Sequence, residues 1–468
     1  MNKYRKLAFN TIVFAVGSFG SKIFSLLLNN LYTRHISPAD FYTKTLIETT
    51  ALFLLPVFTF SLTEAVVRYG LDRKYSKKQI FTTASVLIFA GLMLMIIFMP
   101  FTTLIPFMNP VQEYTVMLTV YVCVSSVRSL CSQFVRAMGM VRLFAFDGIL
   151  TTMLLFVFNV LFISHMEMGV RGFMLSVILS DFCSSVFLFI SCRLYRYLDI
   201  KHFNRKLGKS MMRFSLPLIP TTVMWTFTGF SDQIFIGNMC SENSAGIYSA
   251  SAKIPNLLSM LSTIFFQAWN ISAITENDSE DRNEFYSKIY SSYESVLFIG
   301  SAGLIFLIKP ISAILINYNT FPEYSKAYLY APVLITASVF TCLDQFLSGI
   351  YSATKHTLNS LVTVAVACIA NIILNTHLIP VWEINGASTA TFLSYFICFC
   401  IRIADSRRYI PFKFSMLKNI LNTLLILIMC RFTYEQSGII PTAIIMVIVI
   451  IFNIRAVYET FRMIFPHR

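Results

Sequence analysis

The chain has 468 residues, of which 56% are hydrophobic and 13% charged, and its mean hydropathy is +0.67. This much apolar surface exceeds what one soluble core can bury, so the composition excludes an ordinary soluble domain and indicates a polytopic membrane protein. The formal net charge of +14 is compatible with nucleic acid or with a membrane surface, and the positions of the basic residues decide between the two.

Apolar segments long enough to span a bilayer recur along the whole chain. The first follows the basic start MNKYRKLAFN and has no small-residue cleavage site, so we interpret it as a transmembrane helix rather than a cleaved signal peptide. The chain is predicted to be an all-α polytopic membrane protein with about 14 transmembrane helices. The predicted helices lie near residues 9–33, 43–66, 80–104, 112–136, 146–165, 170–194, 213–238, 245–271, 288–317, 326–350, 358–378, 385–404, 416–433 and 438–462.

Lys and Arg are concentrated in one set of the alternating loops. If the N-terminus is cytoplasmic, the inside segments hold most of the 37 basic residues. The outside loops hold only Arg34, Lys44, Arg171, Lys309, Lys326 and Arg431. This is a positive-inside bias, so topology and anionic lipid explain the charge, and no nucleic-acid partner is expected. Both termini are predicted to be cytoplasmic.

An internal repeat relates the two halves of the chain. SQFVRAMG (132–139) aligns with DQFLSGIY (344–351), and the same offset places Asn159 on Asn371. Further on, GVRGFMLSVILSD aligns with EINGASTATFLSY and places Gly172 on Gly386. Two six-helix bundles in parallel orientation are typical of transporters, with the substrate site expected between them. We predict an N-terminal six-helix lobe at 1–196, a basic cytoplasmic linker at 197–212, a C-terminal six-helix lobe at 213–405 and two additional transmembrane helices at 406–468.

Two segments resemble a known family. The run from Leu216 to Asn270, with LPLIP, SDQIFIG, AGIYS and QAW, resembles the second lobe of Wzx-type polysaccharide and O-antigen flippases. These form the polysaccharide biosynthesis branch of the multidrug/oligosaccharidyl-lipid/polysaccharide exporter superfamily. NIILNTHLIPVWEINGASTAT (371–391) is similar to the family's eleventh and twelfth helices. The chain departs from the family at Phe41, where glycine is frequent, and many members have fewer helices.

The resemblance implies a flippase that moves an undecaprenyl-pyrophosphate-linked oligosaccharide repeat unit across the bacterial cytoplasmic (inner) membrane by alternating access. The product would serve capsule, O-antigen or exopolysaccharide synthesis. Implied partners are the lipid-linked glycan, membrane lipids, and the polymerase and glycosyltransferases of the same pathway. No cofactor is expected, and coupling to H⁺ or Na⁺ is left open.

Two other functions are weighed against the flippase. A drug/cation antiporter of the same superfamily would share the architecture. A membrane-embedded polysaccharide polymerase or ligase would need catalytic groups on an outer loop. The predicted outer loops are short and carry no His, Asp or Glu cluster and no Gly-rich phosphate loop, so we do not expect an enzyme. The ten cysteines are scattered without metal-ligand spacing and are interpreted as small core residues.

Basic residues inside the predicted spans are candidates for contact with a diphosphate. Lys22 and Lys253 match, by helix and charge only, an arrangement similar to that of the lipid II branch. For Arg128 an ion pair with Asp147 competes with substrate contact, and a structural pair is the general alternative for all three. Gln267 and Trp269 suit sugar recognition, although a Trp at this position is also an ordinary interfacial anchor.

Two acidic residues inside the spans are candidates for coupling or gating. Asp232 and Lys253 lie about equally far, roughly 16 Å, from the turn that joins their predicted helices, so an ion pair between them is expected to be within reach. A carboxylate that takes up a proton during transport is the alternative interpretation. Glu48 on the second predicted helix is a similar case.

Overall fold

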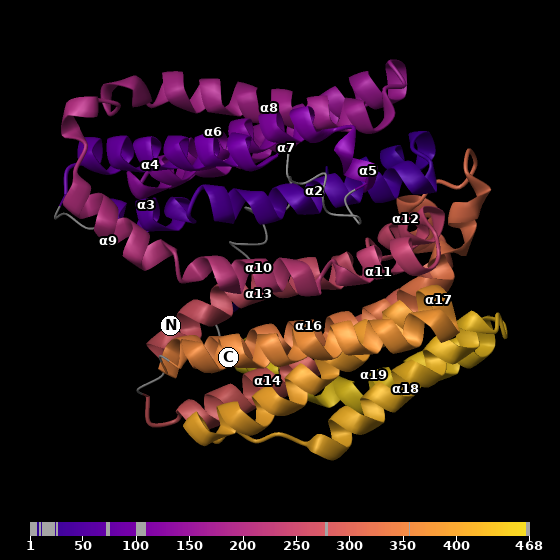
Figure 1. Ribbon diagram of the computed structural model, residues 1–468. Coiled ribbons are helices and arrows are strands. Elements are labelled where there is room, and N and C mark those ends of the chain that lie inside the picture. Colours follow the sequence, from indigo (N-terminus) through magenta and orange to yellow (C-terminus); the bar gives the residue numbers. More distant parts are fainter. Residues whose placement is uncertain are drawn as a thin grey trace. The chain divides into compact units, whose positions relative to one another are not determined.

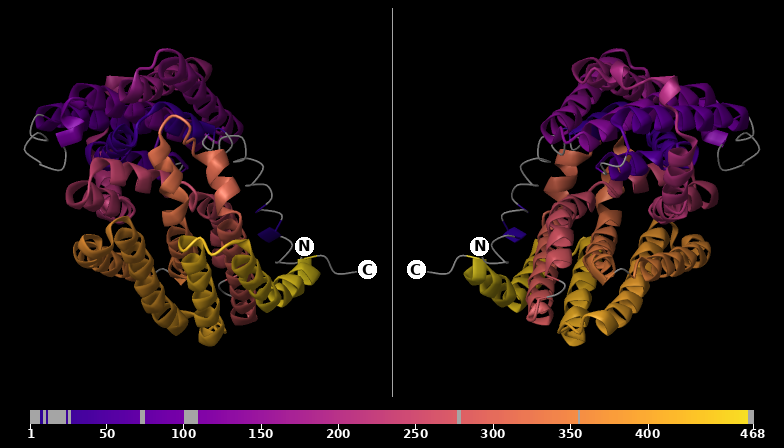
Figure 2. Two further views of the ribbon diagram at one scale, coloured as in Figure 1. Left: turned by 90° about the vertical axis from the view of Figure 1, so that its right-hand side faces the viewer. Right: turned by 90° about the vertical axis from the view of Figure 1, so that its left-hand side faces the viewer.

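The computed structural model describes residues 7–8, 11, 24, 27–71, 75–99, 109–276, 279–354 and 356–464. The chain forms two compact units, one of Ile23–Phe230 and the other of Met1–Lys22 together with Ser231–Arg468. All regular structure in the described ranges is helical, as Figures 1 and 2 show, which confirms the predicted fold class. The predicted division at 197–212 concerns the sequence repeat rather than these units, and it stays a prediction.

The first unit contains the spans of the first half. Its helices are α2 (Pro38–Phe58), α3 (Leu62–Leu71), α4 (Lys77–Phe98), α5 (Asn109–Gln112), α6 (Thr115–Ala137), α7 (Val141–Asn159), the π-helix η3 (Val160–His165), α8 (Gly169–Ser191), the short η4 (Leu194–Arg196) and η5 (Ile200–His202), α9 (Arg205–Ser215) and α10 (Leu218–Thr228). Between α2 and α3 the chain bends by 55°. Phe60 and Ser61 form this bend with positive φ angles.

The second unit contains the second half and the additional helices. Its helices are α11 (Ser231–Met239), α12 (Glu242–Ser251), α13 (Asn256–Thr275), α14 (Arg282–Phe306), α15 (Ile308–Leu315), η6 (Pro322–Lys326), α16 (Ala327–Thr354), α17 (Thr357–Tyr409), α18 (Met416–Tyr434) and α19 (Ile439–Ile464). α14, α18 and α19 lie side by side (Figures 1 and 2).

Nine described helices are long and apolar enough to cross a membrane, or ten if the bent pair α2 and α3 is one span. The predicted count of fourteen is therefore not confirmed. Most of the first predicted span lies outside the described residues, and the predicted helices 213–238 and 245–271 are each broken into shorter helices. Glu383, with φ 49° and ψ −125°, bends α17 between the predicted helices 358–378 and 385–404.

Apolar side chains occur on both the inside and the outside of these helices. Phe346 and Ile236 are buried, whereas Ile97, Ile190 and Ile451 are more than 60% exposed. Exposed apolar side chains along long helices suit contact with lipid acyl chains. The chain is therefore a multi-pass membrane protein.

Candidate functional site

Asp232 lies at the centre of a buried polar cluster in the second unit. It occupies the first turn of α11 and is 3% exposed. The Tyr248 hydroxyl of α12 donates to its Oδ2 atom at 2.5 Å, and the Thr391 hydroxyl of α17 donates to the same atom. The side-chain amides of Asn371 and Asn375 donate to Oδ1 at 3.1 and 2.7 Å. Four neutral donors therefore stabilise this carboxylate, because hydrogen bonds compensate for the loss of water on burial.

The two asparagines belong to one face of α17. They are four residues apart, so both side chains point to the same side of the helix. The Asn375 amide also donates to Asn371 Oδ1 at 3.0 Å, and the Ser231 hydroxyl donates to that same oxygen at 2.6 Å. The buried Asn375 Oδ1 atom accepts no hydrogen bond from a described residue. Because it lies beside the Asp232 carboxylate, the cluster combines an anionic group with an unused oxygen acceptor.

This arrangement can take up a positive charge. A proton could bind directly to Asp232, and a small hard cation could bind to carboxylate and amide oxygens, the ligands that such cations prefer. The described residues contain no group of three or more His, Cys, Asp or Glu side chains placed to hold a metal ion. The donor set therefore favours a proton or a monovalent cation over a transition metal.

Lys253 does not pair with Asp232, so the predicted ion pair is wrong. Lys253 is half-buried in the turn 252–255 between α12 and α13, and it forms no ion pair with a carboxylate that the structure describes. The depth estimate assumed one continuous helix, whereas the turn interrupts that helix beside the lysine. The Lys253 ammonium is therefore not neutralised by a described carboxylate.

Arg128 belongs to a second buried cluster, in the first unit. Its guanidinium lies 3.5 Å from Asp147 on α7 and 3.8 Å from Asp181 on α8. Ser184 donates to Asp147 at 2.5 Å, and Ser125 donates to Asp181. The predicted pair between Arg128 and Asp147 is confirmed. Because one guanidinium faces two carboxylates, its charge is already neutralised within the bundle.

Glu48 is held by a buried lysine in the first unit. The Lys44 ammonium lies 2.8 Å from the Glu48 carboxylate. It also lies over the rings of Tyr32 and Phe173, 4.5 and 4.7 Å from their centroids. Lys44 is 3% exposed and belongs to α2, so its predicted place in an outside loop is wrong. The spacing of four residues to Glu48 was the sequence signal that indicated a helical pair.

Of the other residues predicted to contact the substrate, the structure describes the side chain of Trp269 only. Lys22 and the side chain of Gln267 lie outside the described part of the chain. Trp269 is fully buried, stacks on Phe346 at 4.2 Å and donates from its indole nitrogen to the Phe346 carbonyl at 3.1 Å. It offers no exposed face to a sugar in this structure and is not an interfacial anchor.

Three residues of the Asp232 cluster were missed by sequence reasoning, namely Tyr248, Asn375 and Thr391. Asn375 carries a usable signal, because it follows Asn371 by one helical turn in an apolar segment. Tyr248 lies in the family-like run AGIYS and Thr391 ends the run 371–391, but neither run indicates that these hydroxyls face Asp232. They become site residues only when α11, α12 and α17 pack together.

Comparisons with known proteins agree with these observations. A family model described as "Polysaccharide biosynthesis protein" matches residues 7–271, more than half of the chain. A search of curated protein sequences found no match.

Several solved structures share the fold. The structure is similar to the lipid II flippase MurJ in an inward closed conformation, with a TM-score of 0.70, 16% identity, and coverage of 96% of this chain and 99% of that chain. It is also similar to an inward-facing multidrug resistance MATE family transporter of the MOP superfamily, with a TM-score of 0.69, 14% identity, and coverage of 84% and 94%. A MATE structure in complex with MaL6 has a TM-score of 0.64 at 15% identity, with coverage of 88% and 97%.

At these identities the likeness shows the fold alone. Family and fold together are those of a transporter rather than an enzyme, as predicted. The family match also confirms the resemblance to the polysaccharide biosynthesis branch. The chain belongs to the family of polysaccharide biosynthesis proteins.

Proposed function

We propose that the protein is a flippase that moves a lipid-linked oligosaccharide across the membrane. The observation that carries the proposal is the family match combined with the fold of a lipid II flippase over 96% of the chain. A sugar headgroup cannot cross hydrocarbon unaided, because its hydroxyl groups would lose their hydrogen bonds to water. A helical transporter supplies a polar route while the lipid tail stays in the bilayer.

The proposed substrate is an undecaprenyl-pyrophosphate-linked repeat unit of a capsule, O-antigen or exopolysaccharide. A diphosphate calls for a cation that is not already neutralised. No described carboxylate forms an ion pair with Lys253, so Lys253 meets this condition. Arg128 does not, because its guanidinium already pairs with Asp147 and Asp181. We therefore propose Lys253, together with Lys22, as the main diphosphate contacts. Gln267 is proposed as a sugar contact.

Asp232 is proposed as the coupling group for H⁺ or Na⁺. A proton on its carboxylate would remove an acceptor from Tyr248 and Thr391, while a cation would draw in the free oxygen of Asn375. Either event changes the hydrogen bonds that join α11 and α12 to α17. A change of contacts among packed helices is the usual way in which an ion biases one transporter conformation over another. Glu48, which keeps 38% of its side chain exposed, is proposed as a second gating carboxylate.

The proposed location is the bacterial cytoplasmic membrane, with both termini on the cytoplasmic side. The concentration of Lys and Arg in one set of loops supports this orientation. On this proposal the polymerase and the glycosyltransferases of the same pathway act on the lipid-linked glycan after and before its translocation.

A genetic experiment tests the proposal in cells. Loss of the gene should abolish one surface glycan, and the wild-type gene should restore it. Lys22→Ala and Lys253→Ala should fail to restore the glycan while the protein accumulates to normal amounts, and Lys326→Ala, at an exposed lysine, serves as the matched control. Normal glycan in both variants would show that these two lysines do not bind the diphosphate.

A drug/cation antiporter is the competing function, and the similarity to MATE transporters is the observation that favours it. The same strains separate the two functions. Drug extrusion that depends on the gene, without any effect on surface glycan, would support the antiporter and refute the flippase.

A further inference from the structure

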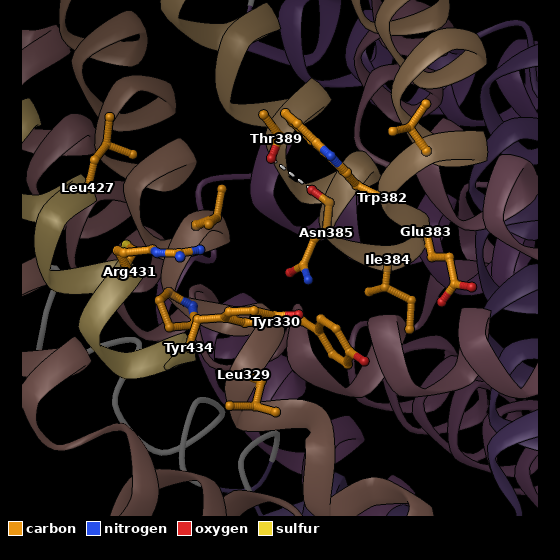
Figure 3. A pocket seen from close by; sticks show the side chains of 14 residues that line it. Leu329, Tyr330, Trp382, Glu383, Ile384, Asn385, Thr389, Leu427, Arg431 and Tyr434 are labelled. Atoms are coloured by element: carbon orange, nitrogen blue, oxygen red, sulfur yellow. Dashed lines mark hydrogen bonds between the residues drawn. The ribbon is translucent and has the colours of Figure 1, made fainter. Parts of the chain in front are cut away.

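The second unit contains a pocket apart from the Asp232 cluster. It encloses about 610 Å³ between the first turn of α16, the bend of α17 and the last turns of α18. This volume falls within the usual range for small-ligand sites, roughly 300–1,000 Å³. Figure 3 shows Arg431 of α18 and Asn385 of α17 extending toward the same open space.

The lining combines aromatic rings with a few polar groups. Tyr330, Trp382 and Tyr434 contribute rings, and the last two are 54% and 48% exposed. Glu383 is exposed and forms no ion pair with a described residue. The Asn385 carbonyl accepts from Thr389 at 2.8 Å, while the Asn385 side-chain amide makes no hydrogen bond to a described residue. A carboxylate and an amide are therefore available to a ligand.

Glu383 occupies a strained backbone position. Its φ of 49° lies in the left-handed region, where a side chain clashes with the backbone and glycine does not. The aligned position of the first repeat is Gly169, with a φ of 54°. Three residues later, each repeat has a glycine whose Cα lies close to a backbone carbonyl oxygen. A Cβ atom at Gly172 would lie 3.1 Å from Phe162 O, and one at Gly386 would lie 2.2 Å from Leu378 O. The aligned residues Gly169 and Glu383 thus both have a positive φ, and Glu383 carries a side chain where the first repeat has glycine. The first repeat has a positive-φ glutamate of its own nearby, Glu167, with a φ of 51°.

The first repeat also differs at the position aligned with Asn385. Arg171 aligns with Asn385, and it forms an exposed ion pair with Glu113. In the second unit, α18 supplies one wall of the pocket. Leu427, Arg431 and Tyr434 are spaced by four and three residues, so they line one face of that helix. The additional helix after the repeat therefore completes a pocket that the repeat alone would not form.

We propose that this pocket binds a sugar ring of a glycan. Aromatic rings offer apolar faces to the C–H groups of a sugar, while the Glu383 carboxylate and the Asn385 amide suit its hydroxyl groups. A phosphate fits less well, because Arg431 is already paired with Glu435 at 2.5 Å and Glu383 would repel an anion. Strained residues cluster at ligand sites, which agrees with a binding role for Glu383.

The biological meaning of the pocket rests on the proposed function. On the proposed topology, the segment with Arg431 faces the outside of the membrane. The pocket would then hold a sugar of the glycan on the side where it is released. It deepens the substrate assignment, because it adds recognition of the sugar to recognition of the diphosphate.

Binding can be tested on the purified full-length protein by tryptophan fluorescence. The probes are D-glucose, D-galactose, N-acetyl-D-glucosamine and L-rhamnose, with inorganic phosphate as a separate probe. At least one sugar should cause a saturable change in emission that is absent in Trp382→Phe. Glu383→Gly should weaken this binding by about tenfold or more while keeping the melting temperature, because glycine adopts the left-handed conformation without a clash. Glu323→Gln, at an exposed carboxylate outside the pocket, should bind as the wild type does.

Three results would overturn the assignment. They are the absence of a saturable change with every sugar, unchanged binding by Glu383→Gly, and a Trp382 response to phosphate alone. Leaflet exchange of lipid-linked oligosaccharide separates this proposal from the proposed function. Exchange without sugar binding would refute the pocket only, and sugar binding without exchange would refute the flippase only.

Discussion

The side-chain amide of Asn375 donates a 2.7 Å hydrogen bond to the carboxylate of Asp232, while its own amide oxygen accepts none from a described residue. The two residues lie on α17 and α11, 143 positions apart in the sequence. An acidic group in hydrocarbon is costly, and neutral donors compensate that cost without a counter-charge. This leaves the carboxylate able to accept a proton or a cation.

Asp232→Asn should abolish coupled transport while the protein still folds. The asparagine keeps the size of the side chain, and its oxygen can still accept from the amides of Asn371 and Asn375. Its NH2 group would face the hydroxyls of Tyr248 and Thr391, which can turn to accept, so we expect a change in stability of only about 1 kcal/mol. Transport driven by an H⁺ or Na⁺ gradient should be lost, because the group that takes up the ion is gone. Gradient-driven uptake and thermal melting in detergent measure the two effects separately. Full transport by this variant would rule out Asp232 as the coupling group.

Arg128→Met should destabilise the first unit, because Asp147 and Asp181 would remain in the bundle without a cation. Breaking a buried ion pair costs on the order of 3 kcal/mol. Asp181→Asn added to Arg128→Met should restore part of the loss, since one buried carboxylate becomes neutral. Melting temperatures of the single and double variants give the coupling between the sites. If the double variant were no more stable than Arg128→Met, the ion pairs would contribute nothing to folding.

Lys44→Met should also lower stability, by about 1–3 kcal/mol, because Glu48 would lose the cation that holds it. The loss is limited by the 38% exposure of Glu48, which lets water take over part of the solvation. Glu48→Gln in the Lys44→Met background should recover stability. A melting curve of Lys44→Met that matches the wild type would contradict the buried ion pair.

Gly349→Ala tests the packing of Trp269. A Cβ atom at position 349 would lie 2.6 Å from the indole Nε1, and Trp269 would have to leave its stacked position on Phe346. Overpacking of this kind typically costs about 1–3 kcal/mol. Gly303→Ala is the matched control, because nothing lies within 4 Å of a Cβ there. Equal melting temperatures for the two variants would show that Trp269 is not packed as described.

The sequence was sufficient to predict the membrane class, the family and the pair of Arg128 with Asp147. Hydropathy and the uneven distribution of Lys and Arg are visible in short stretches of the sequence, and so is the short separation between Arg128 and Asp147. The partners of Asp232 could not be predicted in the same way. Thr391 follows it by 159 positions, and such a contact depends on how α11 and α17 pack.

The errors in the prediction have local causes. Lys44 was counted with the outside loops because it lies next to residue 43, the predicted start of its helix, whereas α2 begins earlier, at Pro38. Lys253 was assigned to a continuous helix, although a turn at 252–255 separates α12 from α13. A break near Glu383 was predicted, because the predicted helices 358–378 and 385–404 leave residues 379–384 between them. The positive φ of Glu383 itself could not be predicted, since glycine rather than glutamate is the residue that signals it.

The most direct test of the central claim is leaflet exchange in proteoliposomes. Purified protein is reconstituted with fluorescent undecaprenyl-pyrophosphate oligosaccharide, and a membrane-impermeant reagent measures how fast the label reaches the outer leaflet. The account predicts faster exchange than in empty liposomes, a large reduction in Lys253→Ala, and wild-type exchange in Lys326→Ala. Exchange no faster than in empty liposomes, with folded wild-type protein in the membrane, would contradict it.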